Sequence, residues 1–142
     1  AQWLHSTWGN VSSLDFAGFM SRDKLQDTYA STDCLVFPSR IETWGLPISE
    51  FLPYNRPMLL SDLPFAHETA AGADAVGFFD PSSAVALADA MERVLRGDHT
   101  QLQPVPQRPL QAPSARSWAE LFELLLSSNG ATQSNSFTQP TP

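Results

Sequence analysis

The sequence has one cysteine, few basic residues and no long apolar run, and each shortage excludes a class of protein. With Cys34 as the only cysteine, the chain can form neither an internal disulfide nor a cysteine-based metal site. Its 8 lysines and arginines form no cluster and leave a net charge of −7, which excludes a concentrated positive surface for nucleic acid. No apolar run approaches the roughly 20 residues that a membrane-spanning helix requires.

No secretory signal is expected from the first residues of this sequence. No basic segment followed by an apolar segment opens the sequence, and the first residue is Ala1 rather than Met. We therefore expect a processed, excised or partial sequence, in the cytoplasm, where an unpaired cysteine fits. The three histidines have no partners at the spacing of metal ligands, so neither a metal site nor a cofactor is predicted.

Short apolar runs alternate with segments of helical periodicity along most of the chain. This alternation predicts an α/β fold, a Rossmann-like parallel sheet flanked by helices on both faces. The run at 34–37 is typical of a strand that is buried on both sides. Strands are expected at residues 14–17, 34–37, 58–60 and 76–79, and helices near residues 21–31, 47–55, 64–71 and 84–96.

The composition changes after Gly97. Proline and glutamine become frequent over residues 98–114, which predicts a linker or an extended crossing segment. An amphipathic helix is expected within 115–128, and the polar residues 129–142 are typical of a disordered tail. The expected organisation is therefore a lead-in over 1–10, a Rossmann-like domain over 11–97, the linker, the helix and the tail.

Residues 38–50 carry the pattern most suited to binding chemistry. They join a predicted strand to a helix that begins near Pro47, and ligands of parallel sheets bind at the carboxyl ends of the strands. Backbone N–H groups just before a helix have no intrahelical partner, and the helix dipole makes this end positive. A diphosphate is therefore expected to bind there, and Gly45 allows the ligand to approach the backbone closely.

Two glutamates frame this predicted anion site. Glu42 precedes the turn and Glu50 is expected in the first helical turn, so that both reach one crevice from opposite sides of the loop. A carboxylate can accept hydrogen bonds from two neighbouring hydroxyl groups of a ribose or a sugar ring. The alternative is that both are solvated residues favoured by the helix dipole, and their spacing alone does not separate the two interpretations.

The wider pattern resembles the signature of retaining glycosyltransferases with the GT-B fold, in particular the large family four. The resemblance rests on Pro-Ser-x-x-Glu ending at Glu42, on Gly45-Leu46-Pro47 and on Glu50. It covers roughly residues 11–127. The supporting segments, in the order of the family's motifs, are residues 16–21, residues 25–36, Asn55-Arg56-Pro57-Met58, Ser61-Asp62, Glu68 and Ser117-Trp118.

The resemblance implies a role for each residue of the site. Glu42 would face the transferred sugar near the reacting carbon and is the candidate catalytic residue. Nucleotide-sugar binding would fall to Glu50 at the ribose, to Thr43, Trp44, Gly45 and Leu46 at the sugar and diphosphate, and to Gly18, Phe19 and Met20 at the base. No metal ligand is implied.

The resemblance also implies parts that this sequence does not contain. The family's phosphate-binding arginine and lysine have no counterpart before residue 11, and its N-terminal acceptor domain is absent. The expected function is that of the donor-binding C-terminal half of a retaining hexosyltransferase of polysaccharide biosynthesis, incomplete and inactive alone. Its expected partners are a nucleotide-diphosphate sugar and the missing domain, and a membrane surface only through the parent enzyme. The alternative is a truncated, non-catalytic module that binds a nucleotide sugar or another protein.

Overall fold

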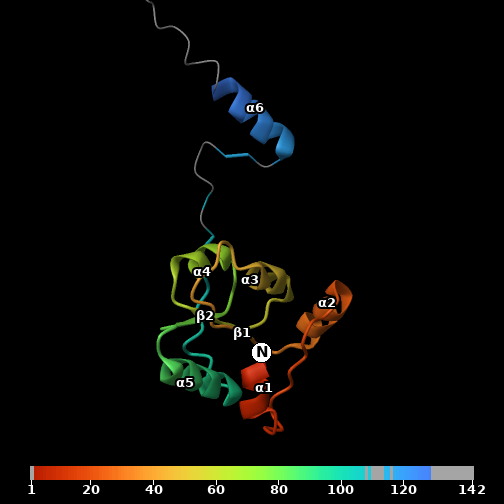
Figure 1. Cartoon of the computed structure of the whole chain (residues 1–142). Coiled ribbons are helices and arrows are strands. Elements are labelled where there is room, and N and C mark those ends of the chain that lie inside the picture. The colour runs from red at the N-terminus through yellow and green to blue at the C-terminus, as the bar shows by residue number, and fades with distance from the viewer. Residues whose placement is uncertain (1, 108, 110–113, 116, 129–142) are drawn as a thin grey trace, which may run out of the picture. The chain divides into compact units, whose positions relative to one another are not determined.

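The computed structural model describes residues 2–107, 109, 114, 115 and 117–128. The chain divides between Gln107 and Arg108 into two units, which we call the sheet unit and the C-terminal unit (Figure 1). Residues 110–113 of the predicted linker and the predicted tail at 129–142 lie outside the described residues. Within those described, no helix is both long enough and apolar enough to cross a membrane.

Three parallel strands form the centre of the sheet unit. They are β1 (Leu35–Phe37), β2 (Met58–Ser61) and β3 (Val76–Phe79), in the order β1-β2-β3. This confirms the predicted α/β fold with a parallel sheet. The prediction that 34–37 is buried on both sides is wrong, because β1 lies at an edge and is only half-buried. The central strand β2 has that environment, with all four residues buried.

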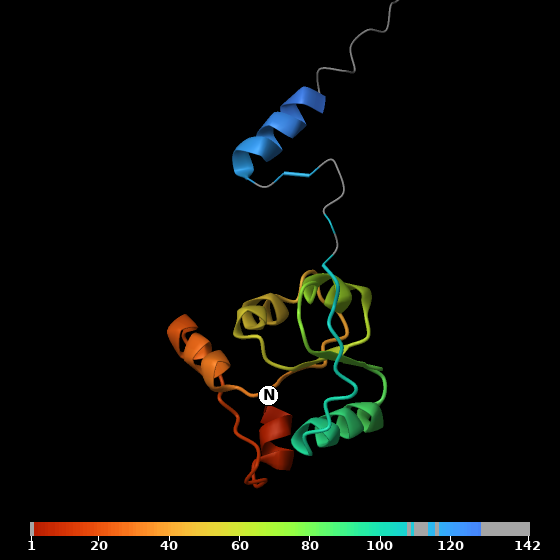
Figure 2. The ribbon, with the colours of Figure 1, turned by 180° about the vertical axis from the view of Figure 1, so that it is seen from behind.

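Helices cover both faces of the sheet, as Figures 1 and 2 show. On one face lie α3 (Leu46–Phe51), its 3-10 extension (Leu52–Tyr54) and α4 (Pro64–Thr69), and on the other lies α5 (Ala84–Leu95). The helix α2 (Arg22–Ser31) joins the first group. The sheet unit is therefore a three-layer arrangement.

The alternation of side chains along β2 divides the core between the two faces. Met58 and Leu60 pack with the buried Ile48 and Phe51 of α3. Leu59 points the other way and packs in the cluster that includes Ala90 of α5. The strands beside β2 and the helices on its two faces exclude water from its side chains. The burial of these apolar side chains stabilises the position of the sheet between the helices.

Local sequence signals set several helix ends as expected. The Ser21 hydroxyl accepts a hydrogen bond from the Lys24 N–H at the start of α2, and Ser83 does the same for Ala86 at the start of α5. After the 3-10 turn, Asn55 adopts the left-handed conformation with φ of 49°, which lets the chain reverse into β2.

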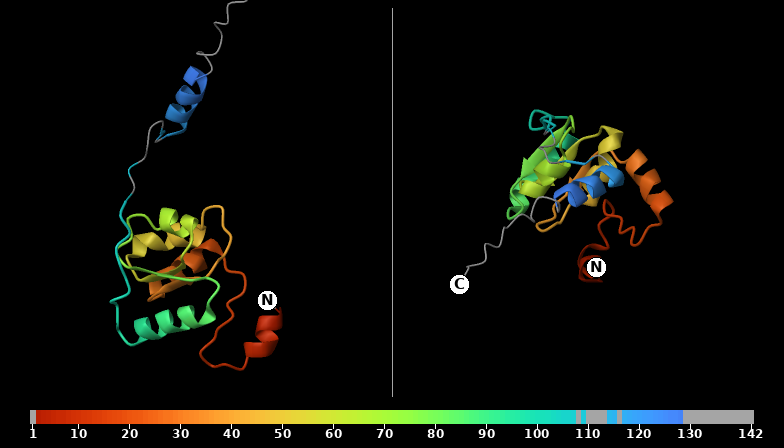
Figure 3. Two further views of the ribbon diagram at one scale, coloured as in Figure 1. Left: turned by 90° about the vertical axis from the view of Figure 1, so that its left-hand side faces the viewer. Right: turned by 90° about the horizontal axis from the view of Figure 1, so that it is seen from above.

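The N-terminal part of the chain differs from the prediction. Residues 14–17 form no strand, and the apolar side chains of Leu14 and Phe16 are exposed. Upstream of them, the predicted lead-in forms a helix, α1 (Gln2–Trp8). The helix α1 and the irregular segment after it lie outside the layers of the sheet (Figure 3).

Residues 98–107 form an extended crossing segment along the free edge of β3. Gln103 pairs with Val76 in an antiparallel bridge, and the Val105 carbonyl accepts a 2.8 Å hydrogen bond from the Gly72 N–H. The Val105 N–H donates in turn to the Ala73 carbonyl. This segment satisfies backbone groups that an open sheet edge would leave to solvent.

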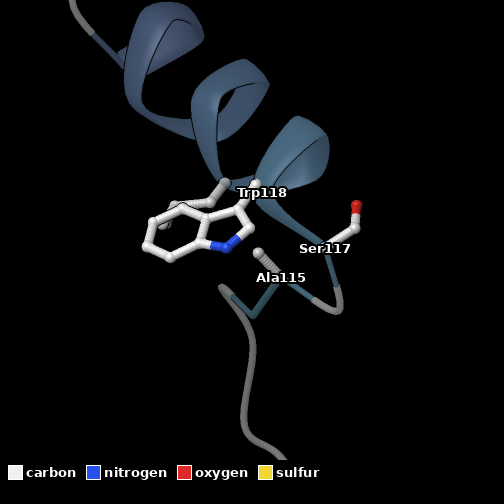
Figure 4. Close-up of a pocket in the computed structure, with 4 residues that line it drawn as sticks. Ala115, Ser117 and Trp118 are labelled. Carbon is white, nitrogen blue, oxygen red and sulfur yellow. The ribbon is translucent and has the colours of Figure 1, made fainter.

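The C-terminal unit contains one described helix, α6 (Trp118–Ser128), as predicted. Ser117 caps it by accepting a hydrogen bond from the Glu120 N–H at 3.2 Å. The Trp118 and Phe122 rings lie 6.4 Å apart on its surface, and both are exposed. Figure 4 shows the Trp118 indole beside Ala115, with which it lines a shallow hollow.

Asn55 allows a direct test of the turn before β2. Asn55→Ala is expected to lower the free energy of unfolding by roughly 1–2 kcal/mol, because an ordinary side chain is disfavoured at positive φ. Asn55→Gly is the matched control and should stay much closer to the wild type, since glycine adopts this conformation without a steric cost. Urea denaturation followed by circular dichroism measures both, and equal losses for the two variants would contradict this assignment.

Candidate functional site

The carboxyl ends of the three strands lie at one edge of the sheet, because the strands are parallel and paired in consecutive order. The chain leaves β1 into the loop 38–45, which we call the signature loop. It leaves β2 at Asp62 and β3 at Asp80. Polar side chains from three separate segments therefore meet the same edge.

Within the signature loop, Glu42 is exposed and held by a neighbour. The Ser39 hydroxyl donates a hydrogen bond to a Glu42 carboxylate oxygen at 2.8 Å. In the sequence Ser39 is notable only as the serine of the Pro-Ser-x-x-Glu pattern. The structure shows that it contacts the glutamate of the same pattern. The bond restricts the Glu42 side chain to one side of the loop, while its second oxygen stays available to a ligand.

The end of the signature loop is anchored to α4. The hydroxyl of Thr69, which is buried, donates a hydrogen bond to the Trp44 carbonyl. Gly45 follows with φ of 80°, a conformation that favours glycine, and caps α3. A methyl group on Gly45 would lie 3.2 Å from Ile48 Cδ1, so the loop packs closely here.

The backbone of this loop presents free donors. Among the described residues, the N–H groups of Thr43, Trp44 and Gly45 have no hydrogen-bond partner. The side chains of Thr43, Trp44 and Leu46 are exposed, whereas Gly45 is buried. Such amides can donate hydrogen bonds to an anion.

Glu50 lies further along α3 than the sequence indicates. The helix begins at Leu46 rather than Pro47, because the left-handed Gly45 starts it one residue earlier, and no acidic residue lies in its first turn. Glu50 is half-buried and faces α2, where the Tyr29 hydroxyl donates to its carboxylate at 3.4 Å. The contact spans 21 positions, so no local signal in the sequence predicts it.

A hollow of about 330 Å³ opens at the sheet edge beside Glu42. The signature loop contributes Arg40, Ile41 and Glu42 to it, and the start of α4 contributes Leu63, Pro64 and Phe65. The hollow thus combines a carboxylate, a guanidinium and an apolar wall. Glu50 is not among the residues that line it.

Asp80 adds a carboxylate at the end of β3. Hydrogen bonds from the hydroxyl and the N–H of Ser82 lower the pKa of Asp80, and the nearby positive charge of Arg40 lowers it further. The charge of Arg40 therefore acts across the ends of the strands, from the loop after β1 to the residue after β3.

The turn at residues 18–20 comes before α2. Gly18 has φ of 65°, and the Phe19 side chain is fully exposed. Met20 accepts a contact from the Thr28 hydroxyl at 3.6 Å, which ties the turn to α2. In the described part of the chain, no hydrogen bond joins this turn to the signature loop.

His67 and Asp62 form a further polar pair at this edge. The His67 Nε2 lies 2.7 Å from an Asp62 carboxylate oxygen, and the imidazole stacks on Phe78 with ring centres 3.8 Å apart. This stacking joins α4 to β3 and leaves no mark in a local sequence pattern. Among the residues that the structure describes, no three metal-binding side chains come together.

The site and fold together define an α/β domain with an exposed strand-to-helix loop at the carboxyl edge of its sheet. Residues 8–107 match the family described as glycosyl transferases group 1. The match covers more than half of the chain, so the chain belongs to this family. No curated protein and no solved structure matches the chain.

The bond from Thr69 to the Trp44 carbonyl predicts a stability effect. Thr69→Val keeps the shape but removes the donor, and the free energy of unfolding should fall by about 1 kcal/mol. Thr69→Ser is the matched control because it keeps the hydroxyl. Urea denaturation measures both variants, and a Thr69→Val protein no less stable than Thr69→Ser would count against this anchor.

The raised pKa of Tyr29 predicts that the free energy of unfolding depends on pH in the alkaline range. Burial raises the pKa of Tyr29 above its ordinary 10.0, and the neighbouring Glu50 charge raises it further. The folded state therefore prefers the protonated phenol, and this stabilisation is fully present below pH 10 and is lost as the pH rises through the raised value.

Tyr29→Phe removes this group and provides the comparison. The wild type should lose stability relative to Tyr29→Phe as the pH rises above 10, and the difference between them should stay constant from pH 7 to 9. Urea denaturation across this range measures it. A difference that does not change up to pH 11 would disprove the assignment.

Proposed function

We propose that this chain is the donor-binding half of a retaining glycosyltransferase of GT-B architecture, which transfers a hexosyl group from a nucleotide-diphosphate sugar. The observation that carries the proposal is the signature loop at the carboxyl edge of the sheet. It brings free backbone donors and a restrained carboxylate into one short segment. Membership of the group 1 glycosyl transferases supports the same reaction class.

In this proposal the two glutamates bind different parts of the donor. Glu42 accepts hydrogen bonds from the transferred sugar, because it is exposed beside the hollow and oriented by Ser39. Glu50 accepts hydrogen bonds from the ribose hydroxyls, and Tyr29 orients its carboxylate for that role. The two hydroxyl partners hold the carboxylates before the donor arrives, which lowers the entropy lost on binding.

The diphosphate lies against the backbone between these glutamates. Amides of Thr43, Trp44, Gly45 and Leu46 donate to its oxygens and stabilise the negative charge that grows as the bond to the sugar breaks. The nucleotide base lies against the turn of Gly18, Phe19 and Met20, where the exposed Phe19 ring offers a stacking surface. The donor is the only small molecule required, and no cofactor is proposed.

In this proposal the acceptor is held by another domain of a complete enzyme and approaches the exposed Glu42 side chain from the solvent. We place such an enzyme in the cytoplasm and in polysaccharide biosynthesis, where nucleotide sugars are consumed. Any contact with a membrane comes through that enzyme. The chain alone is expected to bind the donor without transferring the sugar.

Titration calorimetry of the full chain with UDP, GDP and ADP tests the donor site. One of them should bind in the micromolar to millimolar range, and Glu50→Gln should weaken its binding about tenfold through the lost charge-assisted hydrogen bonds. Asp27→Asn, which removes an exposed carboxylate on α2, is the matched control and should bind like the wild type.

Each unfavourable result has a defined meaning. No binding of any of the three nucleotides to the folded chain would contradict the donor site. Equal binding by Glu50→Gln and the wild type would contradict the ribose contact alone.

A further inference from the structure

The sheet edge that would bind a diphosphate carries much negative charge. Glu42, Asp62 and Asp80 all lie there, and the chain as a whole has a net charge of −7. A diphosphate brings further negative charge, and backbone amides alone must overcome the repulsion unless a cation lies nearby. The basic side chains of the described residues therefore identify which groups can take this role.

Most of these basic side chains are unsuited to it. Arg56 donates to the Thr32 carbonyl, Arg93 pairs with Asp98, and Arg96 pairs with Glu92. Arg22 and Lys24 lie exposed on α2 and do not line the hollow. Each of the five is therefore either paired or absent from the lining of the hollow.

Arg40 has the required position and freedom. It lies in the signature loop, lines the hollow together with Glu42 and is exposed. Within the described ranges it forms no hydrogen bond and no ion pair. Asp80, at the end of β3, accepts hydrogen bonds from the N–H and the hydroxyl of Ser82 on one carboxylate oxygen, at 2.8 and 2.6 Å.

We propose that Arg40 is an anion-binding residue of the donor site, beside the hydroxyl-binding Glu42. This inference rests on the proposed function and names the cation that the site requires. A guanidinium offers several donors in one plane and binds phosphate or carboxylate with two parallel hydrogen bonds. Glu42 thus binds a hydroxyl group and Arg40 an anionic group of the same ligand.

The anionic group has two chemical sources. It belongs either to the diphosphate, which all donors share, or to a carboxylate on the transferred sugar, as in a uronic acid donor. The apolar wall of Leu63, Pro64 and Phe65 lowers the local exposure to water and strengthens either contact. Binding measurements with matched donors distinguish them.

The experiment uses the full chain with three probes built on the same base, the one that the wild type binds among UDP, GDP and ADP. The probes are the nucleoside diphosphate, its glucose conjugate and its glucuronate conjugate, and titration calorimetry gives their dissociation constants. Arg40→Gln removes the charge, Arg40→Lys keeps a charge without the planar donor pair, and Arg22→Gln is the matched control. Circular dichroism and urea denaturation verify that each variant folds.

If the anion is the diphosphate, Arg40→Gln should raise the dissociation constants of all three probes about tenfold. If it is the sugar carboxylate, only the glucuronate conjugate should lose affinity. In both cases Arg40→Lys should fall between wild type and Arg40→Gln, and Arg22→Gln should stay within twofold of the wild type.

The opposing results separate the two proposals. Unchanged binding of all three probes to folded Arg40→Gln would overturn the role of Arg40 and leave the donor site standing. If Arg22→Gln weakened the binding of the probes as much as Arg40→Gln does, the effect of Arg40 would be that of general surface charge. This result would also overturn the proposed role of Arg40. A wild type that binds no nucleotide or conjugate overturns the proposed function and the role of Arg40 together.

Discussion

The burial of β2 between two helical layers is the constraint on which the rest of the structure depends. Its four residues are all buried, and its backbone pairs with β1 on one side and β3 on the other. Because a parallel strand must end at the same edge as its neighbours, this burial fixes where the loops after all three strands emerge. The signature loop lies at the carboxyl edge of the sheet as a consequence of this packing.

Contacts between distant segments complete the site. The buried hydroxyl of Thr69 holds the carbonyl of Trp44, and the hydroxyl of Tyr29 approaches Glu50 from α2. Tyr29 belongs to the apolar cluster that packs on β2, and Thr69 lies on α4 next to Ala70 of the same cluster, so the geometry of the candidate site depends on the packing of the sheet unit. A change in the packing of α2 or α4 is therefore expected to alter the signature loop or the orientation of Glu50.

Much of the fold was predictable because its signals are local. Serine caps, prolines at helix starts and the left-handed Asn55 act within a few residues, and the strands and helices from residue 21 to residue 96 follow them closely. The expected strand at 14–17 is absent from the structure. A strand forms only by pairing with another strand, and a local pattern does not specify that pairing. For the site, the sequence indicated the signature loop. It indicated neither the bond from Tyr29 to Glu50 nor the bond from Thr69 that anchors the loop at Trp44, since both contacts span more than 20 positions.

We infer that the signature loop binds the donor through its backbone. Nuclear magnetic resonance of the ¹⁵N-labelled chain during titration with a nucleotide-diphosphate sugar tests this residue by residue. We expect the largest amide shifts at Thr43, Trp44, Gly45 and Leu46, and smaller shifts at Gly18, Phe19 and Met20. Saturation of the chain with unchanged amides at Trp44 and Gly45, or shifts confined to another surface, would contradict it.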